Sequence, residues 1–325
     1  MMNSTDAQAW QDYWERTRRA GVVPEIGARD PALRDFWLAF FTSCALADEG
    51  HTRVLDLGCG HGAVTALAES VARNNLRHFR ITCLDVSDAA IDLVKAQHPE
   101  VAAVCASADD IPLPDAFFDH VVSQFGIEYA PLEAAGEAAR VLRPGGSVAF
   151  LMHLENGAIW NECRDNRDAL DGIHDSGALP AFIRLIEEAL ALRQGLGTRD
   201  AFEQADRDLA PCVKAMEGVI QQHGREIGGG LVFRTYADIA HMYRKMNAFE
   251  PAEVIAWADR VQAAMAAWRE RMQSMLDAAL DETALMAWRE RLAAGGLLMD
   301  PPARLTLGDP ARDGAWILRG KKVSR

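Results

Sequence analysis

The stretch Val54-Leu55-Asp56-Leu57-Gly58-Cys59-Gly60-His61-Gly62 decides the fold of this chain. Its first four residues form a short, mostly apolar run, which is typical of a strand buried on both faces. The glycines that follow permit positive φ angles and let the backbone approach a ligand closely. A helical pattern begins at Ala63, and the free N–H groups of its first turn would face the same ligand. This order of strand, glycine-rich turn and helix indicates a ligand-binding turn of an α/β fold.

The same alternation continues through the first half of the chain. Further apolar runs predict strands at residues 79–84, 101–105, 120–123 and 147–152. Helical patterns between the strands cover residues 63–75, 88–98 and 132–142. Alternation of this kind predicts a doubly wound α/β sheet. Residues 303–307 and 315–319 predict a terminal hairpin around a turn-rich loop. We expect five parallel strands in the first half, completed by this hairpin.

Helical sequence flanks this α/β unit on both sides. Residues 1–50 contain two helical patterns, at 7–20 and 31–48, and the first carries Trp10, Tyr13 and Trp14. These aromatic side chains either pack on the sheet or form a lid over a ligand cleft. We therefore expect an α/β domain from residues 51–153 and 301–325, and an α-helical insertion or cap from residues 154–300.

The helical insertion contains one long apolar stripe. Its members recur at alternating steps of four and three residues between 254 and 279. Such a stripe is either the buried face of a helix bundle or a coiled-coil-like seam through which a homodimer would form. Gly228-Gly229-Gly230 marks a flexible break between helices of the insertion.

The composition limits the partners of the protein. The formal net charge of -13 over 325 residues disfavours nucleic acid, whose affinity comes largely from Lys and Arg. No apolar run has the length of a membrane span, and the charged N-terminal residues do not resemble a signal peptide. The 6 cysteines lack the spacing of metal ligands. We expect a cytoplasmic protein that binds no metal.

Acidic residues mark the ends of the first two predicted strands. Asp56 precedes Gly58 by two positions, and Asp85 ends the second apolar run. An acidic side chain at the tip of the second strand can accept hydrogen bonds from both hydroxyls of a ribose. Alternatively, Asp85 stabilises the positive end of the helix that follows it. The glycine spacing is G-x-G-x-G, whereas dinucleotide-binding folds have G-x-G-x-x-G, which argues against an NAD-dependent oxidoreductase.

Four motifs resemble those of class I S-adenosylmethionine-dependent methyltransferases. In order, they are residues 56–62, Asp85-Val86-Ser87, residues 106–114 with 118–123, and Val141-Leu142-Arg143-Pro144-Gly145-Gly146. The resemblance covers about residues 50–155 and the terminal hairpin. It implies the Rossmann-like, seven-stranded sheet of that family, with the last strand of the hairpin antiparallel and inserted next to the fifth. It also implies S-adenosylmethionine as cofactor. Residues 154–300 depart from the simple family pattern, so the identity of the methyl acceptor and the atom methylated stay open.

The resemblance also implies which positions contact the cofactor. Gly58 and Gly60 would border its methionine part, Asp85 would hold the ribose, and Asp109 would lie near the adenine amino group. The full set implied at the cofactor is Asp56, Gly58, Cys59, Gly60, Asp85, Val86, Ala108, Asp109, Gln124, Phe125 and Gly126. Cys59 is a small residue of the turn, because no partner that would activate a nucleophile is visible.

The activity implied is methyl transfer to a small-molecule acceptor by in-line displacement, for which alignment of the acceptor is the main task. A general base is needed only if the acceptor atom begins protonated. His153 and Glu128 are the candidate catalytic residues, although His153 is alternatively a structural histidine. The candidate acceptor contacts are Tyr129, Glu155, Asn156 and Trp160. A non-catalytic S-adenosylmethionine-binding protein, whose insertion binds a regulatory partner, is the alternative function.

Overall fold

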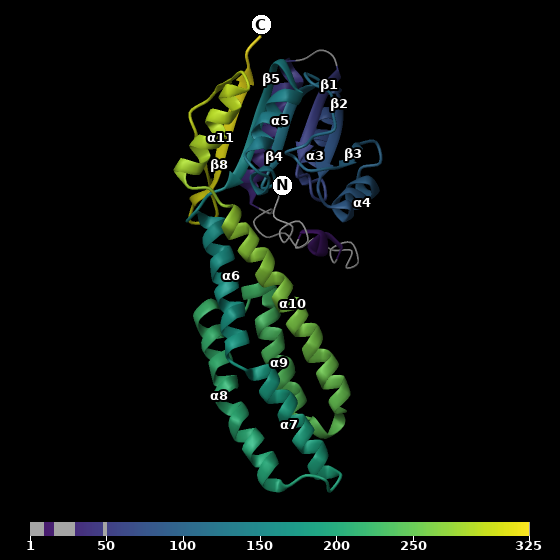
Figure 1. The fold of residues 1–325 in the computed structure, drawn as a ribbon, viewed down its shortest axis with the longest axis vertical. Coiled ribbons are helices and arrows are strands. Elements are labelled where there is room, and N and C mark those ends of the chain that lie inside the picture. The colour runs from purple at the N-terminus through teal and green to yellow at the C-terminus, as the bar shows by residue number, and fades with distance from the viewer. Residues whose placement is uncertain (1–9, 16–29, 48–50, 325) are drawn as a thin grey trace. The chain divides into compact units, whose positions relative to one another are not determined.

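The computed structural model describes residues 10–15, 30–47 and 51–324. The chain divides into two compact units (Figure 1). The sheet unit consists of Met1–Asn161 and Ser274–Arg325, and the helical unit consists of Glu162–Gln273. Within the first unit, residues 10–15 are helical, and the rest of the helix predicted at residues 7–20 lies outside the described residues.

An eight-stranded sheet forms the centre of the sheet unit. The strands are β1 (His51–Leu57), β2 (His78–Asp85), β3 (Ala102–Cys105), β4 (Phe118–Gln124), β5 (Leu142–His153), β6 (Leu297–Met299), β7 (Ala303–Leu307) and β8 (Arg312–Lys322). Their order is β3-β2-β1-β4-β5-β8-β6, and β7 also pairs with β8. Strands β1 to β5 pair in parallel. Strand β8 runs antiparallel beside β5, so the predicted position of the last strand is confirmed.

Strand β6 adds an eighth strand to the seven that the sequence predicts. It pairs antiparallel with β8 from Leu297–Lys322 to Met299–Gly320. Three residues are too few to show the alternation by which a strand is recognised, and Gly295 and Gly296 precede them immediately. Local sequence therefore carries no signal for β6, which forms because β8 offers an edge with which to pair.

The helices of the sheet unit begin and end close to the predicted positions. They are α2 (Pro31–Ala47), α3 (Ala63–Asn74), α4 (Asp88–Gln97), the 3₁₀ helix η1 (Ile127–Tyr129), α5 (Glu133–Val141) and α11 (Glu282–Ala294). Two of them begin at side-chain caps. Ser87 Oγ accepts from Ala90 N at the start of α4, and Asp281 accepts from Ala284 N at the start of α11, which satisfies backbone donors that have no partner within the helix.

Helices cover both faces of the sheet, as a doubly wound fold requires. Leu285, Trp288 and Leu292 of α11 share a core with the alanines of α5 and with Val121 of β4. On the opposite face, the Trp37 indole of α2 donates to Gln124 of β4. Because side chains alternate along a strand, positions 121 and 124 lie on opposite faces, so α2 and α11 cover opposite faces of the sheet.

The division between the units differs from the expected insertion at residues 154–300. Residues 154–161 and 274–300 belong to the sheet unit, because α11 and β6 are part of its core. Helical periodicity alone indicates that α11 is a helix but not which unit it packs against. The helical unit is correspondingly shorter, at residues 162–273.

The helical unit has its own apolar core. Its elements are α6 (Ala158–Asp175, from Glu162 on), α7 (Ala178–Arg193), α8 (Arg199–His223), η2 (Ile227–Gly230), α9 (Leu231–Arg244), η3 (Met246–Ala248) and the part of α10 (Pro251–Ala278) that ends at Gln273. Val254, Ala258 and Met265 of the predicted stripe are buried in this core. That part of the stripe is thus the inner face of a bundle, which is one of the two interpretations left open by the sequence.

The glycine break at residues 228–230 is held by packing within the helical unit. Gly228 N donates to Asn166 Oδ1 at 2.6 Å. A Cβ at Gly229 would lie 2.5 Å from the Trp268 ring, so the ring fills the space beside the backbone. The break separates α8 from α9 as predicted, and these contacts pack it against α6 and α10 within the helical unit.

Two properties concern the described residues as a whole. None of the described helices combines the length and apolarity needed to cross a bilayer. Within the same residues, no group of His, Cys, Asp and Glu side chains has an arrangement that could hold a metal ion.

The assignment of α11 to the sheet unit can be tested by its stability. Trp288 is buried in the shared core, so Trp288→Ala should lower the free energy of unfolding by about 3–5 kcal/mol, the usual cost of such a truncation. Glu290→Ala, on the exposed side of the same helix, should change it by less than about 0.5 kcal/mol. Urea unfolding of both variants measures the difference. If both variants changed the free energy of unfolding by the same small amount, α11 would not contribute to this core.

Candidate cofactor-binding and active site

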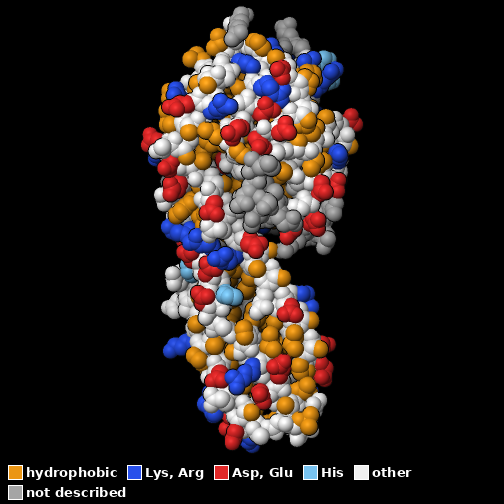
Figure 2. Space-filling model, viewed as in Figure 1, with side chains coloured by type: hydrophobic (Ala, Val, Ile, Leu, Met, Phe, Trp, Pro, Cys, Tyr) orange, Lys and Arg blue, Asp and Glu red, His pale blue; other side chains and the backbone are white. Residues whose placement is uncertain are grey.

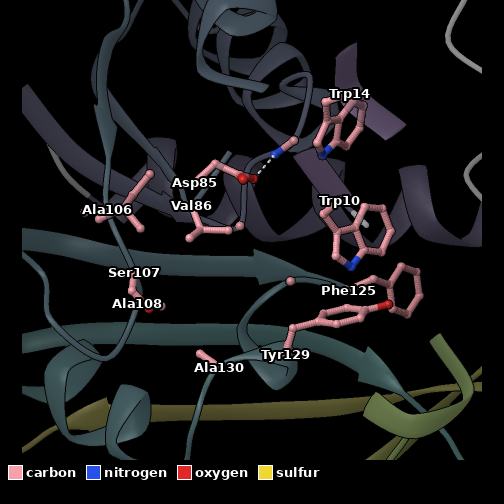
Figure 3. A pocket seen from close by; sticks show the side chains of 14 residues that line it. Trp10, Trp14, Asp85, Val86, Ala106, Ser107, Ala108, Phe125, Tyr129 and Ala130 are labelled. Carbon is pink, nitrogen blue, oxygen red and sulfur yellow. Dashed lines mark hydrogen bonds between the residues drawn. The ribbon is translucent and has the colours of Figure 1, made fainter. Parts of the chain in front are cut away.

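Loops at the carboxyl ends of β1, β2, β3 and β4 meet in one pocket (Figure 3). Carboxyl ends of parallel strands lie at the same edge of a sheet, where open α/β folds bind their ligands. The residues that line the pocket are Trp10, Trp14, Gly58, Gly60, Leu84, Asp85, Val86, Ala106, Ser107, Ala108, Phe125, Gly126, Tyr129 and Ala130. The pocket brings together seven of the predicted cofactor residues and the predicted acceptor contact Tyr129.

The floor of the pocket depends on a contact between two backbones. A Cβ at Gly58 would lie 2.7 Å from Gly126 Cα, and one at Gly126 would lie 2.9 Å from Gly58 Cα. Any other side chain at either position would push the β1 and β4 loops apart. Ser123 fastens the same two loops, because its hydroxyl donates to Leu57 O at 2.7 Å and accepts from Ile127 N at 3.0 Å. The sequence analysis did not identify Ser123, whose role requires the strand pairing to be known.

Asp85 connects the second strand to the glycine turn. Its Oδ2 accepts from Gly60 N at 2.9 Å, and its Oδ1 accepts from Ser87 N at 2.9 Å. The side chain is only 7% exposed, and this burial raises the pKa of Asp85 although the two N–H donors lower it. Figure 3 shows the carboxylate at the wall of the pocket, joined to the glycine turn. Its remaining lone pairs can accept hydrogen bonds from ligand hydroxyls.

Asp56 and Cys59 lie beneath the turn and do not line the pocket. Asp56 Oδ2 accepts from Thr65 Oγ1 at 2.8 Å, and burial raises the pKa of Asp56 to about 7. The pKa of the Cys59 thiol is raised well above its usual range by a hydrogen bond with Cys83 and by burial. A thiol of this kind stays protonated and is a poor nucleophile. Both residues support the turn from below, and neither contacts the pocket as a cofactor ligand would.

Small residues form the side of the pocket next to Val86. Ala106, Ser107 and Ala108 line it, whereas Asp109 does not. The Asp109 carboxylate accepts a hydrogen bond from Ser107 Oγ, which lowers the pKa of Asp109. The structure therefore brings Ala108 to the pocket as predicted but holds Asp109 beside it, and Ser107 is a lining residue that the sequence analysis missed.

Gln124 also lies away from the pocket, in contrast to the prediction. Its Oε1 accepts from Trp37 Nε1 at 2.7 Å, so the amide is bound to α2. Position 124 is on the face of β4 that α2 covers, whereas Phe125 and Gly126, past the end of the strand, line the pocket. The pairing could not be read from the sequence, because Trp37 and Gln124 are far apart in the chain.

The aromatic residues of the N-terminal segment form a wall of the pocket. The Trp14 ring lies against Gly60, where a Cβ would be 2.7 Å from it. The Trp10 ring is 5.3 Å from that of Tyr129, and Figure 3 shows both tryptophans facing the pocket. Gln11 Oε1 accepts from Ser87 Oγ at 2.6 Å. The described part of this segment thus packs on the sheet unit and borders the pocket, which combines the two interpretations that the sequence left open.

Glu128 and His153, the predicted catalytic pair, are in direct contact. Glu128 Oε1 accepts from His153 N at 2.9 Å and lies 2.8 Å from His153 Nδ1. Both side chains are almost fully buried. The His153 ring lies 4.5 Å from that of Phe125 and 5.8 Å from that of Tyr129. The pair therefore lies directly behind two residues that line the pocket.

The other predicted acceptor contacts lie in the turn that follows β5. Glu155 N donates to Leu280 O at 3.1 Å, and Asn156 O accepts from Asn161 Nδ2 at 2.8 Å. Glu155 and Asn156 are exposed, and Trp160 is partly buried. None of the three lines the pocket, so the structure places them just after His153 in the chain but not in the cavity itself.

Comparison with known proteins relates part of the sheet unit to methyltransferases. Residues 55–150 match a family model described as a methyltransferase domain. An uncharacterized methyltransferase of Mycobacterium tuberculosis is 37% identical over 117 residues, which are 35% of this chain and 42% of that protein. A fatty-acid O-methyltransferase of Mycolicibacterium smegmatis is 33% identical over 115 residues, which are 34% of this chain and 40% of that protein.

One solved structure is similar over part of its length. The S-adenosylmethionine-dependent methyltransferase of Mesorhizobium loti is 24% identical and aligns with a TM-score of 0.30, covering 35% of this chain and 52% of that one. The chain spans about two fifths of the length of the relatives that it matches in sequence. From the family model and the relatives in sequence, residues 55–150 are a methyltransferase domain of the class I, S-adenosylmethionine-dependent type. These residues lie within the Rossmann-like sheet.

The raised pKa of Asp56 predicts a dependence of stability on pH. In the unfolded chain this carboxyl ionises near pH 4, whereas in the folded protein it ionises near 7. Between these values the folded state binds more protons, so the contribution of Asp56 to the free energy of unfolding falls as the pH rises from about 4 to about 7. Asp56→Asn should remove this fall while keeping an acceptor for Thr65. Urea unfolding across this range measures the difference, and parallel curves for the two proteins would contradict the assignment.

Proposed function

We propose that this protein transfers a methyl group from S-adenosylmethionine to a small-molecule acceptor by in-line displacement, in the pocket beyond β1, β2 and β4. The observation that carries the proposal is the buried carboxylate of Asp85. It is held at the pocket wall by Gly60 N and Ser87 N, next to a glycine turn of the methyltransferase domain. A buried carboxylate in that position suits the ribose hydroxyls of the cofactor.

The remaining lining residues suit the other parts of this cofactor. Gly58 and Gly60 leave room beside the turn for the methionine part. Val86 and the small residues Ala106 and Ala108 offer an apolar surface of the kind that an adenine ring packs against. When bound, the cofactor supplies a methyl group that its sulfonium has already activated. The protein then has mainly to orient the acceptor and to exclude water.

Charge and surface favour a small molecule over a nucleic acid as the acceptor. The net charge is -13, which opposes binding to phosphate-rich polymers. On the face shown in Figure 2, acidic and basic side chains are interspersed. The pocket has an aromatic wall of Trp10, Phe125 and Tyr129, which suits an organic molecule with an apolar part. The named acceptor of one relative, a fatty acid, is also a small organic molecule.

The ribose assignment predicts a loss of cofactor affinity. Asp85→Asn keeps the shape of the side chain but removes its charge and one acceptor, so S-adenosylhomocysteine should bind about 1.5–3 kcal/mol more weakly, the range for hydrogen bonds to a charged group. Asp110→Asn, an exposed carboxylate outside the lining, should bind normally. Calorimetry measures both affinities. Unchanged binding by Asp85→Asn in a folded protein would refute the assignment.

We further propose that the turn after β5 contacts the acceptor, because it follows His153 directly in the chain. This role predicts an effect on turnover and none on cofactor binding. Asn156→Ala and Trp160→Ala should abolish turnover and leave S-adenosylhomocysteine affinity normal, because both residues lie outside the pocket lining. The assay incubates each protein with methyl-labelled cofactor and fractionated cell extract and follows the labelled product. Loss of cofactor binding, or full activity in both variants, would place the acceptor elsewhere. Cofactor binding without any labelled product in the unmodified protein would favour the non-catalytic alternative.

A further inference from the structure

We infer that Glu128 and His153 form a proton-accepting pair, and that the acceptor is methylated at an oxygen or nitrogen that carries a proton at neutral pH, as in a hydroxyl or an ammonium group. The inference rests on the proposed function and narrows its substrate class. A carboxylate, which is already ionised, would not need such a pair. Three features of the pair support it: its hydrogen bonds, its two buried atoms that lack partners, and its position behind the pocket.

Glu128 fixes the orientation of the His153 ring. The carboxylate Oε1 is 2.9 Å from the backbone N of His153 and 2.8 Å from Nδ1 of the same residue. An ionised carboxylate only accepts hydrogen bonds, so Nδ1 carries the hydrogen and donates it. In the neutral ring, Nε2 then carries the lone pair. His153 is held in the tautomer that can take up a proton at Nε2.

The two atoms that face away from this contact have no hydrogen-bond partner. His153 Nε2 and Glu128 Oε2 are both buried, and no described residue bonds to either of them. A buried polar atom without a partner is costly, and such atoms are rare in folded proteins. A polar hydrogen of a ligand is the missing partner that suits an accepting Nε2.

Other histidines of the sheet unit show that this arrangement is unusual. His98 is also buried and pairs through Nδ1 with Glu69 Oε2 at 2.9 Å. Among the described side chains, the only histidine atom that is buried without a partner is Nε2 of His153. Both sites have a contact between a carboxylate and a histidine. A buried Nε2 without a hydrogen-bond partner is found, among the described histidines, only at His153.

The pair lies behind the part of the pocket wall that Phe125 and Tyr129 form. His153 ends β5, and Glu128 belongs to η1, which follows β4. The rings of Phe125 and Tyr129 contact the His153 ring and also line the pocket. Glu128 and Tyr129 of η1 are the titratable groups in these contacts, and the register partner of His153 in β8, Ala315, does not titrate. Glu128 is therefore the group whose charge stabilises a protonated His153.

The proposed step is balanced in atoms and electrons. The proton of the heteroatom passes to His153 Nε2, and the resulting imidazolium is stabilised by the carboxylate of Glu128. The heteroatom uses a lone pair to form the bond to the methyl carbon, and the electron pair of the broken carbon–sulfur bond stays on sulfur. In an ammonium group the proton passes before this bond forms, because its nitrogen has no lone pair until then. The proton leaves to water after the product departs.

The tautomer of His153 tests the inference without an acceptor. Nitrogen NMR of the full chain with labelled histidine, at neutral pH and with S-adenosylhomocysteine bound, should show hydrogen on Nδ1 and none on Nε2. Glu128→Gln should change the His153 signals and leave those of His98 unchanged, because a glutamine amide can donate to Nδ1. A proton on Nε2 in the unmodified protein would overturn the inference, while normal binding of S-adenosylhomocysteine in the same sample would leave the proposed function intact.

Kinetics with the labelled extract fraction provide the second test. His153→Gln should lower kcat by about 100- to 10,000-fold, the usual contribution of a general base, with little change in KM or in S-adenosylhomocysteine affinity. His98→Gln should keep the kcat of the unmodified protein. An unchanged kcat in His153→Gln, or a methylated atom that carries no proton in the acceptor, would overturn the inference. Absence of cofactor binding would instead refute the proposed function.

Discussion

The close approach of the Gly58 and Gly126 backbones is the constraint on which the site depends. No Cβ fits between them, so the ends of β1 and β4 meet and form a continuous floor. Ser123 bonds to both loops, and Asp85 ties the β2 end to Gly60. The ends of β1, β2 and β4 therefore form one surface, on which the groups that face the pocket have fixed positions. The helices on both faces of the sheet hold these strands in place.

The buried carboxylates in and around the site differ in their surroundings. Asp56 lies under the glycine turn, where the charge of Asp85 and the loss of water both raise its pKa. Asp85 keeps hydrogen bonds to two N–H groups and faces the pocket. Behind the aromatic wall, Glu128 and His153 form a second buried polar group. The three carboxylates have different surroundings and therefore different roles. Asp56 supports the turn, Asp85 faces the pocket and Glu128 orients His153.

The sequence predicted features that arise from local or repeated patterns. It did not predict contacts between residues that lie far apart in the chain. The glycine turn and the parallel strands follow from patterns within short segments, and the position of β8 follows from the family resemblance. Glu128 and His153 could each be named as candidates, but their contact could not be read from the sequence. Gln124 was misplaced, because its partner Trp37 lies in α2, far from it in the chain. Strand β6 is too short to show a strand pattern. The hydrogen bond between Asp109 and Ser107 depends on the geometry of the loop, which the sequence pattern does not determine.

The most direct test of the central claim is a crystal structure of the protein with S-adenosylhomocysteine. The account predicts that the ribose hydroxyls lie within hydrogen-bond distance of the Asp85 carboxylate, with the adenine beside Val86 and Ala108 and the methionine part along Gly58 and Gly60. A ligand bound elsewhere in the chain, or bound in this pocket without contact to Asp85, would contradict it.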